Sequence, residues 1–218
     1  MKEDSWDRLL RIRTSGRDDT GSDQYKYPYE PTPYSVLERL GNSGEIGKNN
    51  TVLDYGCGKG RVDFFLSYQT GCRSVGIEYN ERIYHIALKN KEKAVSGRKT
   101  TFELADAAVY QVPSEIDRCF FFNPFCLDIL KKAMARILES YYGNPREIRL
   151  YFYYPSEEYM RYLTEMDVLD IRGCISCRDL FPGENNREKI LIFSIGQSKG
   201  KNIDILVNIR YNTIVSKD

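Results

Sequence analysis

The stretch VLDYGCGKGR, residues 52–61, decides how this chain folds. A β-branched and apolar run at 51–53 predicts a buried strand that ends at Asp54. Glycines then occupy alternate positions, Gly56, Gly58 and Gly60. The apolar run at 62–66 predicts that a helix follows. Glycine lets a backbone turn tightly and approach a ligand where a Cβ would collide, and the free N–H groups of the turn and of the helix N-terminus face that ligand. The stretch therefore predicts a site for a nucleotide-like ligand.

The spacing of these glycines separates two kinds of cofactor site. The dinucleotide fingerprint is G-x-G-x-x-G, with a pyrophosphate at the helix N-terminus. Here the third glycine, Gly60, comes one residue early, and Arg61 stands at the position of the last glycine in that fingerprint. A nicotinamide oxidoreductase would also need a residue able to deliver protons nearby, and none is evident. The spacing therefore disfavours a nicotinamide site.

Composition restricts the class of protein. The 218 residues suffice for one domain with a proper core, and 41% hydrophobic with 29% charged residues indicates a soluble globular protein. No apolar run approaches membrane-spanning length, and residues 1–10 lack the apolar core of a signal peptide, so we expect a cytoplasmic protein. A net charge of +1 gives no global attraction to nucleic acid or to a membrane, and we expect neither DNA nor a membrane as partner.

The cysteines predict no metal site. Six are scattered along the chain, and only Cys174 and Cys177 form a C-x-x-C pair. Zinc would need two more ligands, and His85 is the sole histidine. We expect reduced, partly buried thiols.

Residues 1–45 predict an N-terminal extension that packs over the site. An apolar cluster fits one face of a short helix at 5–13; it consists of Trp6, Leu9, Leu10 and Ile12. At 25–40, tyrosines alternate with prolines before a second helix, with Thr32 as candidate N-cap and Pro33 in its first turn. The tyrosine rings either stack on a planar or cationic group or pack under the N-terminal helix.

From residue 46 to 218 the pattern of strands and helices predicts one α/β domain. The strands are expected at 51–55, 74–79, 100–106, 118–125, 148–154, 167–177 and 189–196, and the helices at 59–68, 81–95, 127–142 and 157–163. This alternation predicts a Rossmann-like, doubly wound, seven-stranded and mostly parallel sheet. No helix separates the last two strands, so we expect a hairpin and an antiparallel edge strand. The tail at 203–215 is a candidate for a further strand.

Polar residues stand where these strands end. Ligands bind at the carboxyl ends of the strands in such a sheet. Glu78 ends the second strand, where an acid can accept hydrogen bonds from ribose hydroxyls, and Asp106 ends the third, where an adenine edge can lie. Either acid could instead cap a helix or be a solvated loop charge. Their convergence with Asp54 and the glycine turn favours a cofactor site.

The segments VLDYGCGKGR, VGIEYN, ADA and FFFNPF resemble motifs I to IV of the class I methyltransferases that use S-adenosylmethionine (SAM). The lead-in WDRLLRIRTSG…YEPTPYSVLERL also resembles a bacterial group of these proteins, in which a Y-x-P-T-P-Y segment precedes the glycine turn and N-P-F follows it; the similarity runs over 6–155. It implies SAM as cofactor, with Asp54 and the glycines at its methionine end, Glu78 at the ribose and Asp106 at the adenine. The expected cofactor-binding set is Thr32, Asp54, Tyr55, Gly56, Cys57, Gly58, Gly60, Glu78, Tyr79, Asp106, Ala107 and Asn123.

Asn123-Pro124-Phe125 resembles the N-P-P-[YF] motif of amino-group methyltransferases, without its second proline. In that motif the Asn oxygen and a backbone carbonyl orient a planar NH₂ group toward the methyl group. We therefore expect a SAM-dependent methyltransferase acting on nitrogen, with Asn123, Phe125 and Tyr34 positioning the acceptor. Alternatively, Asn123 caps the helix that begins near Leu127 and Phe125 belongs to the core.

A non-catalytic module that binds SAM or a nucleotide is the alternative function. The sequence leaves the acceptor open among a small molecule, a protein and an RNA, and it does not reveal the oligomeric state.

Overall fold

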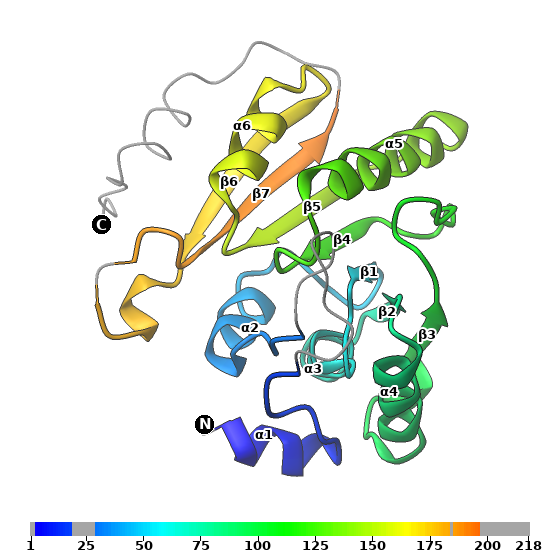
Figure 1. Cartoon of the computed structure of the whole chain (residues 1–218), viewed down its shortest axis with the longest axis vertical. Coiled ribbons are helices and arrows are strands. Elements are labelled where there is room, and N and C mark those ends of the chain that lie inside the picture. Colours follow the sequence, from blue (N-terminus) through cyan, green and yellow to red (C-terminus); the bar gives the residue numbers. More distant parts are fainter. Residues whose placement is uncertain (1–2, 19–28, 184, 197–218) are drawn as a thin grey trace.

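The computed structural model describes residues 3–18, 29–183 and 185–196 (Figure 1). The expected strand at 203–215 and the tyrosines at 25 and 27 lie outside the described residues. The elements are α1 (Glu3–Leu10), α2 (Tyr34–Gly41), β1 (Thr51–Tyr55), α3 (Arg61–Gln69), β2 (Arg73–Glu78), α4 (Glu81–Lys93), η1 (Gly97–Lys99), β3 (Thr100–Leu104), β4 (Arg118–Phe121), α5 (Leu127–Gly143), β5 (Ile148–Tyr153), α6 (Glu157–Glu165), β6 (Leu169–Ser176), η2 (Arg178–Leu180) and β7 (Lys189–Ile195). Within the described ranges, no helix combines the length and the apolar character needed to cross a bilayer.

The seven strands form one sheet in the order β3-β2-β1-β4-β5-β7-β6. The strands from β3 to β5 pair in parallel, and β7 pairs antiparallel with both β5 and β6. The predicted Rossmann-like sheet is confirmed, with the β6–β7 hairpin at its edge. Because β7 is inserted between β5 and β6, its first residues lie beside the last residues of β5; Tyr153 pairs with Ile190.

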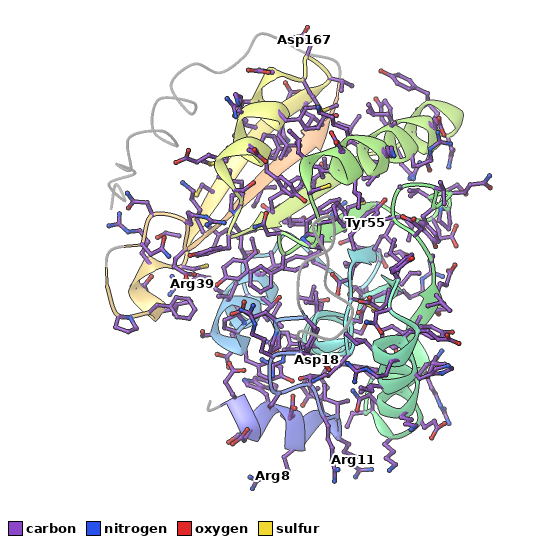
Figure 2. The ribbon with its side chains drawn as sticks, viewed as in Figure 1. Arg8, Arg11, Asp18, Arg39, Tyr55 and Asp167 are labelled. Carbon is purple, nitrogen blue, oxygen red and sulfur yellow. The ribbon has the colours of Figure 1, made fainter. Side chains whose placement is uncertain are left out.

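Successive residues of the central strands contribute to two hydrophobic layers, one on each face of the sheet. Val52 and Phe120 face the layer that contains residues of α1 to α4, whereas Leu53 and Phe121 face the layer that contains residues of α5 and α6. The helices consequently cover both faces of the sheet, as in a doubly wound fold (Figure 1). Tyr55 points into the second layer from the end of β1, in the middle of the molecule (Figure 2).

Helix α1 packs against α2 and α3 through Trp6. The Trp6 ring meets Phe65 edge-on at 4.8 Å and stacks near Tyr34 at 5.9 Å, and its Nε1 donates to Glu38 at 2.9 Å. The helix ends earlier than predicted because Arg11 adopts a φ of 60°. Arg8 and Arg11 point away from the body of the protein (Figure 2). Leu9 of the predicted cluster is 42% exposed.

Left-handed residues move several predicted boundaries near the site. Helix α3 begins at Arg61 instead of residue 59 because Gly60 has a φ of 85°. Strand β4 ends at Phe121, before Asn123 with its φ of 45°. Strand β3 ends at Leu104, so that Asp106 lies in the turn after the strand. These ends shorten the strands and leave their last polar residues in loops, where the side chains can face a ligand.

Candidate functional site

A cavity of about 630 Å³ lies at the carboxyl ends of β1, β2, β4 and β5. Ten of the residues predicted from sequence line it: Thr32, Asp54, Gly56, Cys57, Glu78, Tyr79, Asp106, Ala107, Asn123 and Phe125. Tyr34, Tyr55, Gly58 and Gly60 are not among its lining residues. The cavity lies within the range of volumes that small-molecule sites occupy.

The glycine turn needs glycine at each of its three positions. Gly56, Gly58 and Gly60 have φ values of 73°, 57° and 85°, which side chains with a Cβ rarely adopt. A Cβ at Gly56 would come within 2.8 Å of Pro124, and one at Gly60 within 2.6 Å of Phe102. Gly56 thus lets the turn approach the loop after β4 at the cavity, whereas Gly60 permits tight packing behind it.

Glu78 fixes the shape of this turn. Its Oε2 accepts a hydrogen bond from the Gly58 N–H at 3.0 Å, and its Oε1 accepts one from the Asn80 N–H at 2.8 Å. A carboxylate oxygen can accept more than one hydrogen bond, so the side chain can hold the turn and still accept from a ligand hydroxyl. The contact with ribose stays a prediction.

Asp54 meets a second buried carboxyl group beneath the turn. Asp54 at the end of β1 and Asp63 on α3 are both buried, and within the described ranges neither oxygen of Asp63 has a hydrogen-bond partner. Burial raises the pKa of Asp54 to about 7, with a contribution from the charge of Glu78. Burial, followed by the charge of Asp54, raises the pKa of Asp63 well above its usual range. Asp63 therefore retains its proton beside Asp54. The sequence did not single out Asp63.

Asp106 and Tyr79 border the cavity on the side of β2 and β3. Asp106 Oδ1 accepts a hydrogen bond from the Ala108 N–H at 2.9 Å, which stabilises the turn after β3. Tyr79 is 55% exposed at the opening. Asp106 thus makes the hydrogen bond within a turn that a loop acid commonly makes, and it also lines the cavity. Its contact with adenine stays a prediction.

Asn123 is held in a left-handed conformation with its amide oxygen buried. Its Oδ1 accepts no hydrogen bond from the described residues. Cys126, not Asn123, takes the N-cap position of α5, and no side chain caps that helix end. The helix-cap alternative for Asn123 is therefore wrong, and its oxygen is left without a partner among the described residues.

Phe125 belongs to both the core and the cavity wall. It is 5% exposed and packs edge-on against Tyr55 and Phe121. Its carbonyl oxygen accepts a hydrogen bond from the Tyr159 hydroxyl. This carbonyl already has a partner within the chain, and the core alternative accounts for most of the Phe125 side chain.

The structure places Tyr34 and Thr32 differently from the predictions. Tyr34 is fully buried and its hydroxyl donates to Asp7 at 2.5 Å, so the prediction that it lines the site is wrong. Pro33 takes the N-cap position of α2, which leaves Thr32 facing the cavity instead of capping. Tyr34 packs beneath α1, and the Arg61 guanidinium lies over the Tyr34 ring, 4.2 Å from its centroid. Both interpretations of the tyrosines thus hold for this ring.

Arg61 anchors the N-terminal segment on the glycine turn. The buried guanidinium donates to Thr14 Oγ1 at 2.7 Å and to the Thr32 carbonyl at 3.2 Å, and it pairs with Glu3 and, at 3.8 Å, with Asp7. Burial alone would raise the pKa of Asp7, but hydrogen bonds from Thr14 and Tyr34 and the charge of Arg61 hold it below its usual value. Arg61 stands where the dinucleotide fingerprint has its last glycine, and this difference is the sequence feature that could have pointed to its role.

The far end of the cavity contains residues that the sequence reasoning missed. They are Phe122, Tyr153, Tyr154, Phe181, Arg187 and Glu188. Tyr153 and Tyr154 follow the strand-end rule used for the earlier strands, since IRLYFYY ends there. Glu188 precedes β7, and only the reversed direction of that strand brings it to this edge.

Comparisons with known proteins agree with this architecture. No family model matches the chain. A protein-lysine N-methyltransferase of Saccharolobus islandicus is 36% identical over 73 residues, which is 33% of this chain and 45% of that protein. The match therefore spans less than half of the relative.

Solved structures match over most of the chain. An RNA methyltransferase from Salinibacter ruber, in complex with S-adenosyl-L-homocysteine, superposes with a TM-score of 0.56 over 80% of this chain and 99% of that one, at 16% identity. A TehB-like SAM-dependent methyltransferase from Corynebacterium glutamicum superposes with a TM-score of 0.54 over 88% and 95%, at 17% identity. The chain therefore has the Rossmann-like fold of these methyltransferases.

Proposed function

We propose that this protein is a SAM-dependent methyltransferase that transfers a methyl group to a nitrogen atom. The observation that carries the proposal is the meeting, in one cavity, of the glycine turn, the Glu78 carboxylate and the unpartnered Asn123 oxygen. The polar groups fit SAM: carboxylates for ribose hydroxyls and for the adenine edge, and a glycine turn that admits close approach of the amino-acid part. The methyltransferases of the same fold and the protein-lysine relative support this choice.

The residues of the chain would supply binding and alignment. SAM brings a carbon already activated by a positive sulfur, so the protein mainly orients the acceptor and excludes water. The Asn123 oxygen would accept a hydrogen bond from the acceptor nitrogen, and Phe125 and Pro124 would form the wall beside it. The relative modifies lysine and the Salinibacter ruber enzyme acts on RNA, so both classes of macromolecule remain acceptors to test beside small molecules.

Calorimetric titration with SAM, with NADH as control, tests the cofactor. We expect SAM binding with a Kd in about the micromolar range and no comparable NADH binding. Glu78→Gln should weaken SAM binding about 10- to 100-fold, because a charged acceptor is lost. Glu92→Gln, an exposed carboxylate on α4, is the matched control and should bind like the wild type.

Absence of SAM binding, or preference for NADH, would refute the proposal. Binding of SAM without methyl transfer to any cell fraction would favour the non-catalytic alternative instead. A scan of fractions with labelled SAM therefore follows the titration directly.

A further inference from the structure

One end of the cavity has an acidic and aromatic lining. The Tyr153 hydroxyl donates to Glu188 Oε2 at 2.7 Å, and the Tyr153 ring lies 4.7 Å from the ring of Phe122. Phe122 immediately precedes Asn123, so this pair of rings adjoins the proposed transfer site. Among the described residues, no donor contacts the other Glu188 oxygen, Oε1, and no cation pairs with this carboxylate. An unneutralised carboxylate beside aromatic faces attracts a cation.

The cations at this end of the cavity do not cancel that charge. The Arg187 guanidinium stacks on Tyr154 at 4.1 Å and donates to the carbonyls of Tyr154 and Pro155 at 3.2 and 3.3 Å. Arg187 is therefore held against the wall. Arg17 pairs with Glu30 at 4.0 Å, and both are more than half exposed at the opening. At this end of the cavity, Glu188 is therefore the charged residue that has an oxygen, Oε1, without a hydrogen-bond donor among the described residues.

We propose that this end of the cavity binds the acceptor as a primary ammonium group, with Glu188 as its counter-ion and proton acceptor. The inference rests on the proposed methyltransferase function and specifies its substrate class. An ammonium group cannot be methylated until it loses a proton, because its lone pair is occupied. The exocyclic amino group of a nucleobase is neutral and needs no such proton acceptor, which is why the lining favours an alkylamine.

The proposed reaction consists of a proton transfer followed by the methyl transfer. Glu188 Oε1 takes one proton from R–NH₃⁺ and leaves R–NH₂, whose remaining N–H can donate to the Asn123 oxygen. The nitrogen lone pair then forms the new C–N bond to the methyl carbon as the C–S bond breaks, and that electron pair leaves with sulfur as S-adenosylhomocysteine. The product is R–NH₂⁺–CH₃, and the proton on Glu188 returns to water.

Methyl transfer from labelled SAM to defined amines tests the proposal. The probes are poly-L-lysine and cadaverine, with fully acetylated poly-L-lysine and an oligoribonucleotide as controls. We expect label on one or both amines and none on the controls. Label on poly-L-lysine alone would identify a lysine side chain as the source of the ammonium group, and label on cadaverine alone a small alkylamine.

The Glu188→Gln variant separates a chemical role from a structural one. Glutamine keeps an acceptor for the Tyr153 hydroxyl but takes no proton, so transfer near pH 7.5 should fall by about 100-fold or more. An amine with an ordinary pKa near 10.4 gains about tenfold more free base per pH unit, so the deficit should shrink about 100-fold by pH 9.5. Glu92→Gln should match the wild type throughout.

SAM titration of the same samples distinguishes the two possible failures. A wild type that does not bind SAM would refute the proposed function and this inference together. A wild type that binds SAM but labels neither amine, or labels the oligoribonucleotide instead, would overturn the ammonium inference alone. An unchanged Glu188→Gln rate, or a loss that does not recover with pH, would remove Glu188 from proton transfer and would also overturn it.

Discussion

The ring of Tyr29 lies directly on the backbone of Gly58. A Cβ at Gly58 would come within 2.2 Å of two carbons of that ring. The Tyr29 hydroxyl donates to the Thr14 carbonyl at 2.6 Å, and Lys59 Nζ lies 4.5 Å from the ring centroid. The N-terminal segment is thus seated on the glycine turn through a contact that requires glycine.

Substitution at this contact should be non-additive. Gly58→Ala should destabilise the protein by about 2–4 kcal/mol, because the left-handed backbone and the displaced ring both contribute. Tyr29→Ala should cost less alone and should relieve the steric part in the double variant. Urea unfolding of the four proteins measures the coupling. Additive effects would show that the ring does not constrain Gly58.

Arg61 should be among the residues most sensitive to substitution. Arg61→Met removes a buried cation and leaves Asp7 buried without it, which should cost about 3–5 kcal/mol. Adding Asp7→Asn should recover part of that loss, since the unpaired charge disappears. Urea unfolding gives the stability, and limited proteolysis should cut before residue 33 first. A loss under about 1 kcal/mol would contradict this role.

The Asp54–Asp63 pair should make stability fall as the pH rises. The folded pKa values of both acids are raised, so the folded state holds more protons than the unfolded state above about pH 4, and stability declines through the Asp54 pKa of about 7. Asp63→Asn keeps the shape of the side chain but has no titrating proton. Its stability relative to wild type should rise by up to about 1.4 kcal/mol per pH unit from about pH 4 through pH 7.

Thermal unfolding at several pH values measures this difference. The variant and the wild type share all other titrating groups, so the difference between their curves isolates the pair. Parallel curves would show that Asp63 ionises normally in the folded protein.

Two substitutions at Asn123 distinguish the effect of backbone strain from the effect of losing the amide group. Asn123→Gly keeps the left-handed backbone without strain and removes only the amide, so turnover should fall by about 10-fold or more with little change in SAM affinity or stability. Asn123→Ala should lose the same activity and an additional stability of about 1 kcal/mol. Paired measurements of kcat and SAM Kd check both statements. Full turnover in Asn123→Gly would exclude the amide from the reaction.

The sequence alone was sufficient for features that depend on neighbours along the chain. The glycine turn, the acids at the ends of β1 and β2, and the alternation of strands and helices are local patterns. The sheet agrees with them, and ten of the predicted residues line the cavity. Tyr34 was misplaced because its environment comes from Asp7 and Arg61, 27 residues away on either side. Its burial depends on tertiary packing, which no local pattern encodes.

Glu188 was missed for a topological reason. The rule of looking at carboxyl ends holds for parallel strands, whereas β7 runs the other way and presents its beginning at that edge. The sequence predicts the hairpin of β6 and β7, but not that β7 lies between β5 and β6, which brings Glu188 beside the end of β5.

Because β7 runs antiparallel, the two walls of the cavity come from separate parts of the chain. The turn and acids proposed for the cofactor belong to the first half, whereas the connection between β6 and β7 brings Phe181, Arg187 and Glu188 to the opposite wall. Arg39 on α2, labelled in Figure 2, holds this connection in place by two hydrogen bonds from its guanidinium to Asp179. A hairpin connection tolerates exchange of residues and length better than a central strand. A change in this one loop would therefore alter the wall proposed for the acceptor and leave in place the turn and acids proposed for the cofactor.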